Sequence, residues 1–233
     1  TVSPHETSAA TLPVTSCLDD GSPGTLRSVM YLAQDHDVVD LTQLTCSKIT
    51  LTSGVIDTSM LGYHPLDYLT LNGPGRDALT ISANDVSEIF RTGGYGLYGF
   101  FTINDLTLAQ GGNQYGLPGC IWSLRGTLFL NRVTVTECHA RSDPNAYAGE
   151  YSVGGVKANL LAMNDSTISN SSFTAYYETN TAAGGGAWAG EAVLINSTIT
   201  GNRATALVET TDFNPYLTCG GGIYSPGNLV VIN

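Results

Sequence analysis

The stretch YLTLN (Tyr68–Asn72) is a short apolar strand that ends in asparagine, and five more stretches follow the same pattern. They are FFTIN, LFLN, LLAMN, VLIN and LVVIN, at Phe100–Asn104, Leu128–Asn131, Leu160–Asn164, Val193–Asn196 and Leu229–Asn233. The closing asparagines, Asn72, Asn104, Asn131, Asn164, Asn196 and Asn233, lie 32, 27, 33, 32 and 37 residues apart. A β-rich repeat of this length predicts a solenoid in which each turn buries its apolar face on the next. Turns stacked roughly 4.8 Å apart would place these asparagines inside a bend, where their amides can bond to one another as a ladder.

Two further features recur in the later turns. Glycines precede an apolar residue at Gly119-Cys120-Ile121-Trp122, Gly154-Gly155-Val156, Gly185-Gly186-Ala187-Trp188 and Gly221-Gly222-Ile223-Tyr224. A threonine-containing strand follows the asparagine, as in Val133-Thr134-Val135 and Thr167-Ile168. Glycine at a fixed place in each turn suits corners that need a positive φ. Three short strands per turn predict an all-β, right-handed parallel β-helix.

An amphipathic helix is expected ahead of the repeats. Leu26, Val29, Met30 and Ala33 fall on one helix face, with start signals at Ser22 and Pro23. Such a helix would cap the open end of the solenoid. We therefore expect a flexible segment over 1–12 and one β-helix domain over 13–233, with a cap over 17–46 and repeats from about 47 to 233. Because Asn233 falls in mid-turn, further chain after it, or end-to-end self-association, is also expected.

Composition limits the classes of partner. The net charge of −11 disfavours nucleic acid and anionic membranes as partners. The sequence contains no run of 18 apolar residues, so no membrane span is predicted. Cys17 and Cys46 bracket the first structured segment and are the expected disulfide. Cys120, Cys138 and Cys219 cannot all pair with one another, so at least one is expected to be a buried small hydrophobe. Disulfide use predicts an exported protein, extracellular or on the cell surface.

The segments GGGAWAGEAVLINSTITGNRA and GGGIYSPGNLVVIN resemble the repeats of bacterial secreted and surface right-handed β-helix proteins, which are related to the polymorphic outer-membrane protein repeats. The early DDGSPGTLRSVMYLAQDHDVVDL is similar to the segment that often opens such proteins. The resemblance implies the pectate-lyase-like fold and export from a bacterium. It implies no single activity, because the architecture carries adhesins, enzymes and scaffolds alike.

One column of the repeat collects charge. Asp105, Arg132 and Asp165 each follow a ladder asparagine. They form either a surface ion-pair row or, with Glu178, the weak candidates for a pair of catalytic carboxylates. An arginine between the two aspartates would hold both ionised, which is wrong for a general acid.

Insertions leave the same corner of each turn, at 109–118, 139–153, 173–184 and 203–220. They carry the candidate ligand-binding residues Tyr115, Tyr147, Tyr151, Tyr176, Tyr177 and Tyr216. Tyrosine suits a sugar ring or a protein surface, and the nearby carboxylates would suit Ca²⁺. The alternative is that these rings pack as a secondary core.

The first hypothesis is a non-enzymatic, adhesin-like β-helix that needs no cofactor or metal and presents this loop edge to a carbohydrate or protein. A polysaccharide hydrolase or lyase is the second hypothesis, and a self-assembling structural subunit is the third.

Overall fold

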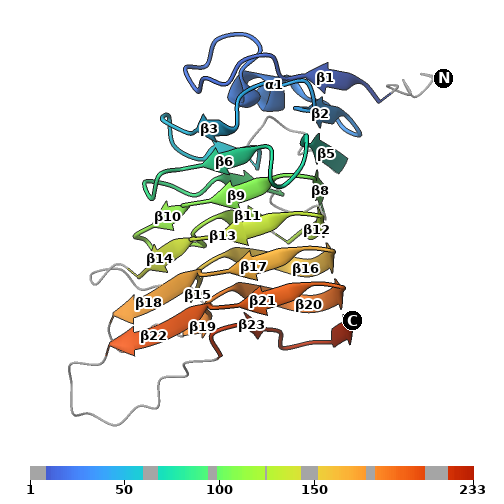
Figure 1. Cartoon of the computed structure of the whole chain (residues 1–233). Helices are drawn as coiled ribbons and strands as arrows, with labels where there is room; N and C mark the ends of the chain where they lie inside the picture. Colours follow the sequence, from blue (N-terminus) through green and yellow to red (C-terminus); the bar gives the residue numbers. More distant parts are fainter. Residues whose placement is uncertain are drawn as a thin grey trace, which may run out of the picture.

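The structure describes residues 9–59, 68–93, 99–123, 125–142, 152–176, 182–207 and 220–233. In this computed structural model they form a column of stacked turns, with the two ends of the chain at opposite ends of the column (Figure 1). Every strand pair in it is parallel, each strand lying beside its equivalent one turn away. The predicted parallel β-helix is confirmed.

Three sheets form the walls of the column. The first, the asparagine sheet, contains β1 (Thr11–Pro13), β2 (Val38–Asp40), β5 (Tyr68–Asn72), β8 (Phe100–Asn104), β12 (Thr127–Asn131), the second halves of β16 (Val156–Asn164) and β20 (Ala187–Ile195), and β24 (Leu229–Ile232). The second, the threonine sheet, contains β3 (Lys48–Thr50), β6 (Thr80–Ser82), β9 (Thr107–Ala109), β13 (Thr134–Thr136), β17 (Thr167–Ser169) and β21 (Thr198–Thr200). The third, the tryptophan sheet, contains β4 (Ile56–Asp57), β7 (Phe90–Thr92), β11 (Ile121–Ser123), the first halves of β16 and β20, and β23 (Ile223–Tyr224).

A fourth strand joins the later turns. The segments expected as insertion loops begin as β10 (Gly112–Asn113), β14 (His139–Arg141), β18 (Ser172–Tyr176) and β22 (Arg203–Leu207), which pair into a lateral sheet beside the column (Figure 1). Two of these segments also hold β15 (Ser152–Val153) and β19 (Ala182–Gly184), which pair with each other. The three predicted strands per turn are present, and from the third turn the chain adds this fourth one.

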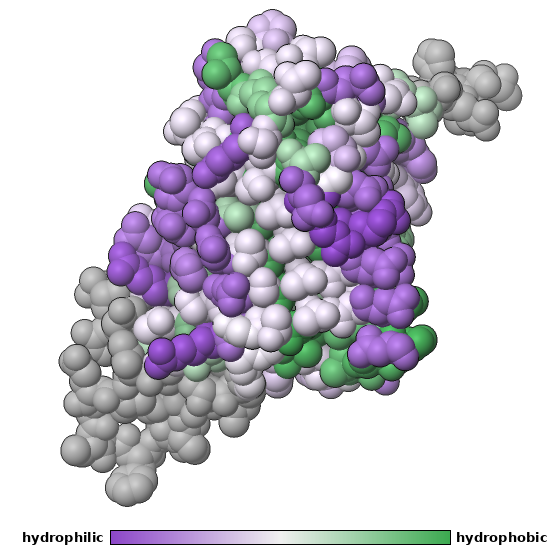
Figure 2. Space-filling model, in the orientation of Figure 1, coloured by the Kyte–Doolittle hydropathy of each residue, from purple (hydrophilic) through white to green (hydrophobic). Residues whose placement is uncertain are grey.

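The core fills the inside of the column. Strand residues alternate between buried and partly exposed, as in β5, where Leu69 and Leu71 are buried and Thr70 faces outward. This period of two lets one side of every strand join a single apolar cluster that runs through all turns. The outer face of the threonine sheet is pale in Figure 2 and lies between two hydrophilic edges.

The asparagine ladder is shorter than predicted and lies on the outer face. Asn72, Asn104, Asn131 and Asn164 are in register, and the Nδ2 amides of Asn104 and Asn131 donate to the preceding Oδ1 atoms at 2.7 and 2.8 Å. Asn164, however, pairs with Ile195, so Asn196 and Asn233 fall one position later. The ladder residues are half-buried rather than inward, because the residue before each of them already occupies the core side of the strand.

Positive φ angles occur at different corners from those predicted. After the ladder position, Asp105, Arg132, Asp165 and Asn196 have φ between 47° and 57°. The repeated glycine pairs serve close packing instead: a Cβ on Gly154 would overlap the Gly185 carbonyl oxygen and lie 2.6 Å from the Ser172 carbonyl carbon. Polar residues therefore form the left-handed corners, while glycine allows adjacent turns to approach.

The cap helix, α1 (Leu26–Leu32), lies at the N-terminal end of the column (Figure 1). Leu26, Val29, Met30 and Ala33 are buried in the core cluster, which confirms the predicted apolar face. Thr25 is the N-cap, and its side chain accepts a hydrogen bond from the Ser28 amide, so the helix begins after the Ser22–Pro23 signals. Strand β1 begins at Thr11, inside the segment that was expected to be flexible, because it pairs with β2.

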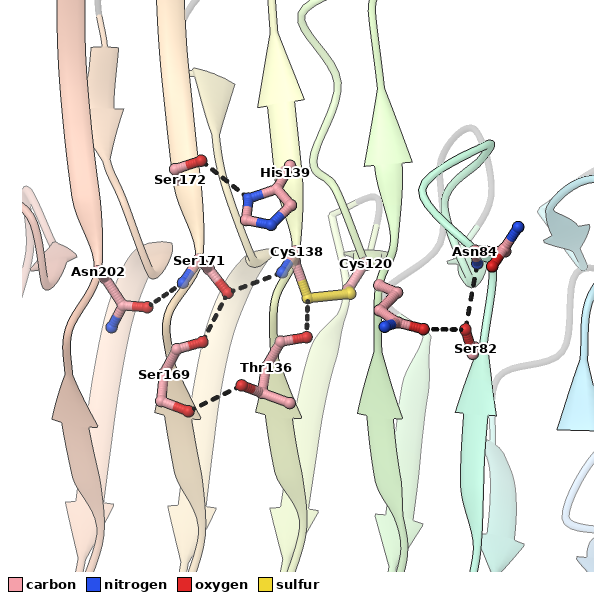
Figure 3. The surroundings of a disulfide bond; sticks show 11 residues. Ser82, Asn84, Cys120, Thr136, Cys138, His139, Ser169, Ser171, Ser172 and Asn202 are labelled. Carbon is pink, nitrogen blue, oxygen red and sulfur yellow. Dashed lines mark hydrogen bonds between the residues drawn. A yellow bond between two sulfur atoms is a disulfide. The ribbon is translucent and has the colours of Figure 1, made fainter. Parts of the chain in front are cut away.

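Two disulfides are present among the described residues. Cys17–Cys46 is the predicted bond. Cys120–Cys138 joins the residue before β11 to the residue before β14 (Figure 3), which assigns partners to two of the three remaining cysteines. Cys219 lies outside the described residues.

Candidate functional site

The most distinctive surface feature is a column of outward side chains on the tryptophan sheet. Parallel pairing places six residues in register, one from each successive turn: Asp57, Arg91, Trp122, Lys157, Trp188 and Tyr224. The residue before each is buried in the core, or partly so in the last turn. We call this set the tryptophan column. It contains both tryptophans of the chain and one of its two lysines.

Cations and indole rings alternate along the tryptophan column. The Arg91 guanidinium carbon lies 5.2 Å from the Trp122 ring centroid. The Lys157 ammonium lies 5.8 Å from the Trp122 ring and 5.4 Å from the Trp188 ring. These distances are within cation–π range. All four side chains are half-buried, so the column holds its rings in fixed positions while part of each remains open to solvent.

Two carboxylates, Glu88 and Asp57, bind the Arg91 guanidinium. Its Nη2 donates to Glu88 Oε1 at 2.7 Å, and its Nη1 lies 3.4 Å from Asp57 Oδ2. Glu88 is only 2% exposed, and this burial raises its pKa even though the Arg91 side chain acts in the opposite direction. A carboxyl with a raised pKa is a common general acid, but Glu88 is enclosed and already bonded, so it cannot reach a substrate.

A cavity of about 240 Å³ opens beside the tryptophan column. It lies where β16 bends from the tryptophan sheet into the asparagine sheet, and it is lined by Trp122, Ser123, Arg125, Lys157, Ala158, Asn159 and Trp188. The backbone of Arg125 is in the left-handed region, with φ of 55°. Although the chain has a net charge of −11, the part of this lining that the structure describes includes two cations and no carboxylate.

A second cavity, of about 340 Å³, lies on the lateral sheet. Its polar lining includes Asn113, His139, Arg141, Ser172 and Thr174. The His139 Nδ1 and Ser172 Oγ atoms are 2.9 Å apart (Figure 3), and Arg141 Nη2 donates to Gln114 Oε1 at 3.0 Å. His139 and Arg141 are exposed, and each has a neutral polar partner, which indicates a polar surface rather than an activated nucleophile.

The predicted loop edge is described only in part. Tyr115 is 68% exposed and therefore does not pack in a secondary core. Tyr176 ends β18, and only its backbone is described. Tyr147, Tyr151, Tyr177, Tyr216 and Glu178 lie outside the described residues, as do the loop carboxylates considered for Ca²⁺. Among the described residues, no three His, Cys, Asp or Glu side chains gather as a metal site.

The predicted charge column contains one ion pair among the described residues, between Arg132 and Asp105. Asp105, Arg132 and Asp165 occupy the same corner of successive turns. Arg132 donates from Nε and Nη2 to the two oxygens of Asp105, at 2.6 and 2.7 Å. This hydrogen bonding lowers the pKa of Asp105, which favours its ionised form and excludes it as a general acid at neutral pH. Arg76 Nη2 donates to the Asp165 carbonyl oxygen at 2.6 Å.

We expect Arg132→Gln to change the free energy of unfolding by less than about 1 kcal/mol, because the Arg132 side chain is exposed and that of Asp105 is partly exposed. Urea denaturation of Arg132→Gln, Asp105→Asn and the double variant measures the coupling between the two side chains. A coupling well above that value would contradict the assignment of a weak surface pair.

The tryptophan column could have been found from the sequence. The glycine-corner motifs end in Trp122, Trp188 and Tyr224 directly after an inward residue, and Lys157 occupies the equivalent place after Val156. Strand alternation makes each of these the first outward residue of its turn. The prediction considered the glycines of these motifs and overlooked the position after the apolar residue.

The described part of the chain contains no helix long and apolar enough to cross a membrane. Comparison with protein-family models, with curated proteins and with solved structures found no match to this chain. The resemblance to the polymorphic outer-membrane protein repeats therefore stays a prediction.

Proposed function

We propose that this protein is an extracellular or cell-surface β-helix that binds carbohydrate through the tryptophan column and the adjoining cavity, without catalysing a reaction. The observation that carries the proposal is the register of Trp122, Lys157 and Trp188 at the rim of a cavity. Two disulfides support a location outside the reducing cytosol.

The chemistry of the tryptophan column suits a sugar. Ligand sites commonly combine aromatic walls with a few fixed polar groups, and here the indole rims lie beside the Lys157 ammonium and the Arg125 guanidinium. The apolar CH groups of a sugar ring can contact the indoles while its hydroxyls accept hydrogen bonds from the cations. Because Lys157 lies between the two tryptophans, the rings are two turns, or roughly 9–10 Å, apart. That separation allows alternate sugar rings of one extended oligosaccharide to contact the two tryptophans.

A binding role fits the described carboxylates better than catalysis does. Hydrolysis of a glycoside needs one carboxyl that is protonated and one that is ionised, both facing the substrate. Asp105 is paired with Arg132, and Glu88, whose pKa is raised, is enclosed. Neither belongs to the cavity lining.

Truncation of one indole tests the proposal. We expect wild-type protein to bind neutral oligosaccharides such as cellohexaose, xylohexaose or maltohexaose, and Trp188→Ala to weaken the best of these at least about 10-fold, because centrally placed aromatic side chains carry much of the free energy of such contacts. Isothermal titration calorimetry measures the affinity, and circular dichroism checks that the variant is folded.

Tyr115→Ala is the control, because it removes an aromatic ring, more exposed than Trp188, from the lateral edge. Loss of affinity in Tyr115→Ala with Trp188→Ala unchanged would move the site to the predicted loop edge. Release of new reducing ends from any of these oligosaccharides would contradict the non-enzymatic assignment. Absence of binding to all of these oligosaccharides would overturn the proposal for neutral glycans.

A further inference from the structure

We infer that the cavity beside the tryptophan column takes an acidic sugar, a single hexuronic acid ring at the end of a glycan, whose carboxylate is bound by Arg125 and Lys157. This inference rests on the proposed carbohydrate binding and specifies its ligand.

The charge of the cavity is opposite to that of the chain. The chain has 20 Asp and Glu residues against 9 Lys and Arg, yet the described residues that line this cavity include two cations and no carboxylate. Three other arginines are bound to acids, Arg27 to Asp19, Arg91 to Glu88 and Arg132 to Asp105. Arg76, Arg141 and Lys48 instead donate to neutral oxygen atoms. Within the described ranges, no hydrogen bond or ion pair holds the exposed guanidinium of Arg125. A bound carboxylate would provide the partner that the protein supplies to those three arginines.

The backbone of Arg125 supports the same assignment. Its φ of 55° is a conformation that a long side chain rarely adopts, and asparagine, aspartate or glycine would adopt it at lower cost. Arg132 has a similar φ, of 53°, but its side chain is bound to Asp105. Strain at a residue without a structural partner favours a role in binding.

The size of the cavity and the charge around it select one ring. A volume of about 240 Å³ is just below the range of roughly 300–1,000 Å³ that holds drug-sized ligands, so it suits one sugar ring with its charged group. A long polyuronate would carry many further carboxylates across a surface with a net charge of −11, which would repel them. A terminal acidic ring places its one charge in the basic cavity and exposes the rest of the glycan as neutral sugar.

Intrinsic fluorescence gives a direct measurement, because Trp122 and Trp188 are the only tryptophans in the chain. The probes are glucuronic acid, glucose and acetate, titrated separately into the full chain at low and high salt. We expect glucuronic acid to bind at least about 10-fold more tightly than glucose or acetate, since a hydrogen bond to a charged group contributes more than a neutral one. The preference over glucose should shrink as salt increases.

Two substitutions of Arg125 and one control assign the preference. Arg125→Gln and Arg125→Gly should each reduce glucuronic acid binding about 10-fold or more and leave glucose binding unchanged. Glycine adopts a φ near 55° without strain, so Arg125→Gly keeps the inference testable if the glutamine variant fails to fold. Lys48→Gln removes an exposed cation from the threonine sheet and should retain wild-type affinity.

The outcomes separate this inference from the proposed function. Equal affinity for glucose and glucuronic acid, or full glucuronic acid binding by Arg125→Gln, would overturn the acidic-sugar assignment and leave carbohydrate binding standing. Acetate binding as tightly as glucuronic acid would overturn it too, since the site would then recognise a carboxylate alone. No response to either sugar, while neutral oligosaccharides bind, would overturn the acidic-sugar assignment alone. No binding by any sugar or oligosaccharide would overturn both proposals.

Discussion

Gly154→Ala should lower the free energy of unfolding by more than about 3 kcal/mol or prevent folding, because the added methyl group has no space. The three heavy atoms nearest to its Cβ are all backbone atoms, two of Ser172 and one of Gly185, so no side chain can rotate away. Gly154 lies between Val153 and the start of β16, and its amide donates to the Gly184 carbonyl oxygen at 3.2 Å. To accommodate the methyl group, adjacent turns would have to separate and weaken such hydrogen bonds.

Gly220→Ala is the matched control for Gly154→Ala. No heavy atom lies within 4 Å of the position of its Cβ, and its φ is outside the left-handed region. Chemical denaturation of both variants, followed by circular dichroism, should give near wild-type stability for Gly220→Ala and a large loss for Gly154→Ala. Equal, small effects would contradict close packing as the reason for the repeated glycines.

Asp19→Asn should lower the free energy of unfolding by about 3–5 kcal/mol, because it leaves the buried Arg27 without its counter-charge. Asp19 is 5% exposed. It accepts hydrogen bonds from Arg27 Nε at 2.7 Å and Nη2 at 2.9 Å, and from the amides of Thr52 and Ser53. One carboxylate therefore connects the cap helix to the loop after β3. Urea denaturation measures the loss, and a change within experimental error would contradict this role.

The neighbouring Asp20 is the control for this substitution. It is exposed, and its side chain bonds only to Ser22. Asp20→Asn removes the same charge from the same segment, and we expect it to leave the unfolding transition almost unchanged. A large effect of Asp20→Asn would show that net charge, and not the buried pair, controls stability.

The dependence on pH gives an independent measure of the Asp19 contribution. Burial alone would raise the pKa of Asp19, but hydrogen bonds from Arg27, Ser53 and Thr52 outweigh it, so the pKa is lowered. A carboxyl with a lowered pKa in the folded state stabilises the fold above the unfolded-state pKa of about 3.9. This stabilisation is lost as the pH falls below that value. Wild-type protein should therefore lose more stability than Asp19→Asn on acidification below about pH 4.

The fold could be predicted well from the sequence because its signals are local and repeated. Alternation in strands such as Tyr68–Asn72 identifies the inward side, and the spacing of Leu26, Val29 and Met30 identifies the cap helix. Cys17 and Cys46 were paired correctly because they bracket one short segment. Register was harder to predict. The motif predicted that Asn196 is equivalent to Asn164, but the structure pairs Asn164 with Ile195. An offset of one residue between turns leaves the sequence motif unchanged, so the motif could not reveal it.

The site could not be predicted to the same extent. The tyrosine-rich composition of the insertions predicted a binding edge there. Of the six candidate tyrosines, Tyr115 is the only one whose side chain the structure describes. The glycine-corner motif of its own turn identifies Lys157 as an outward residue but does not identify its neighbours. Lys157 becomes part of a site only when pairing places it between Trp122 and Trp188, residues 35 and 31 positions away. The surroundings of Glu88 could not be predicted either, because its carboxylate accepts hydrogen bonds from Arg91 and from Asn113 of the next turn.

The sequence by itself determined the repeat, the inward face of each strand and the cap, because these depend on the period of apolar residues within a few positions. The tertiary structure decided which outward residues become neighbours, because that depends on the register between turns about 30 residues apart. It also decided that glycine serves close packing while Asp105, Arg132 and Asp165 form the left-handed corners. Stacking of the turns places the two tryptophans, Lys157 and the nearby arginines on one surface, which no single turn contains.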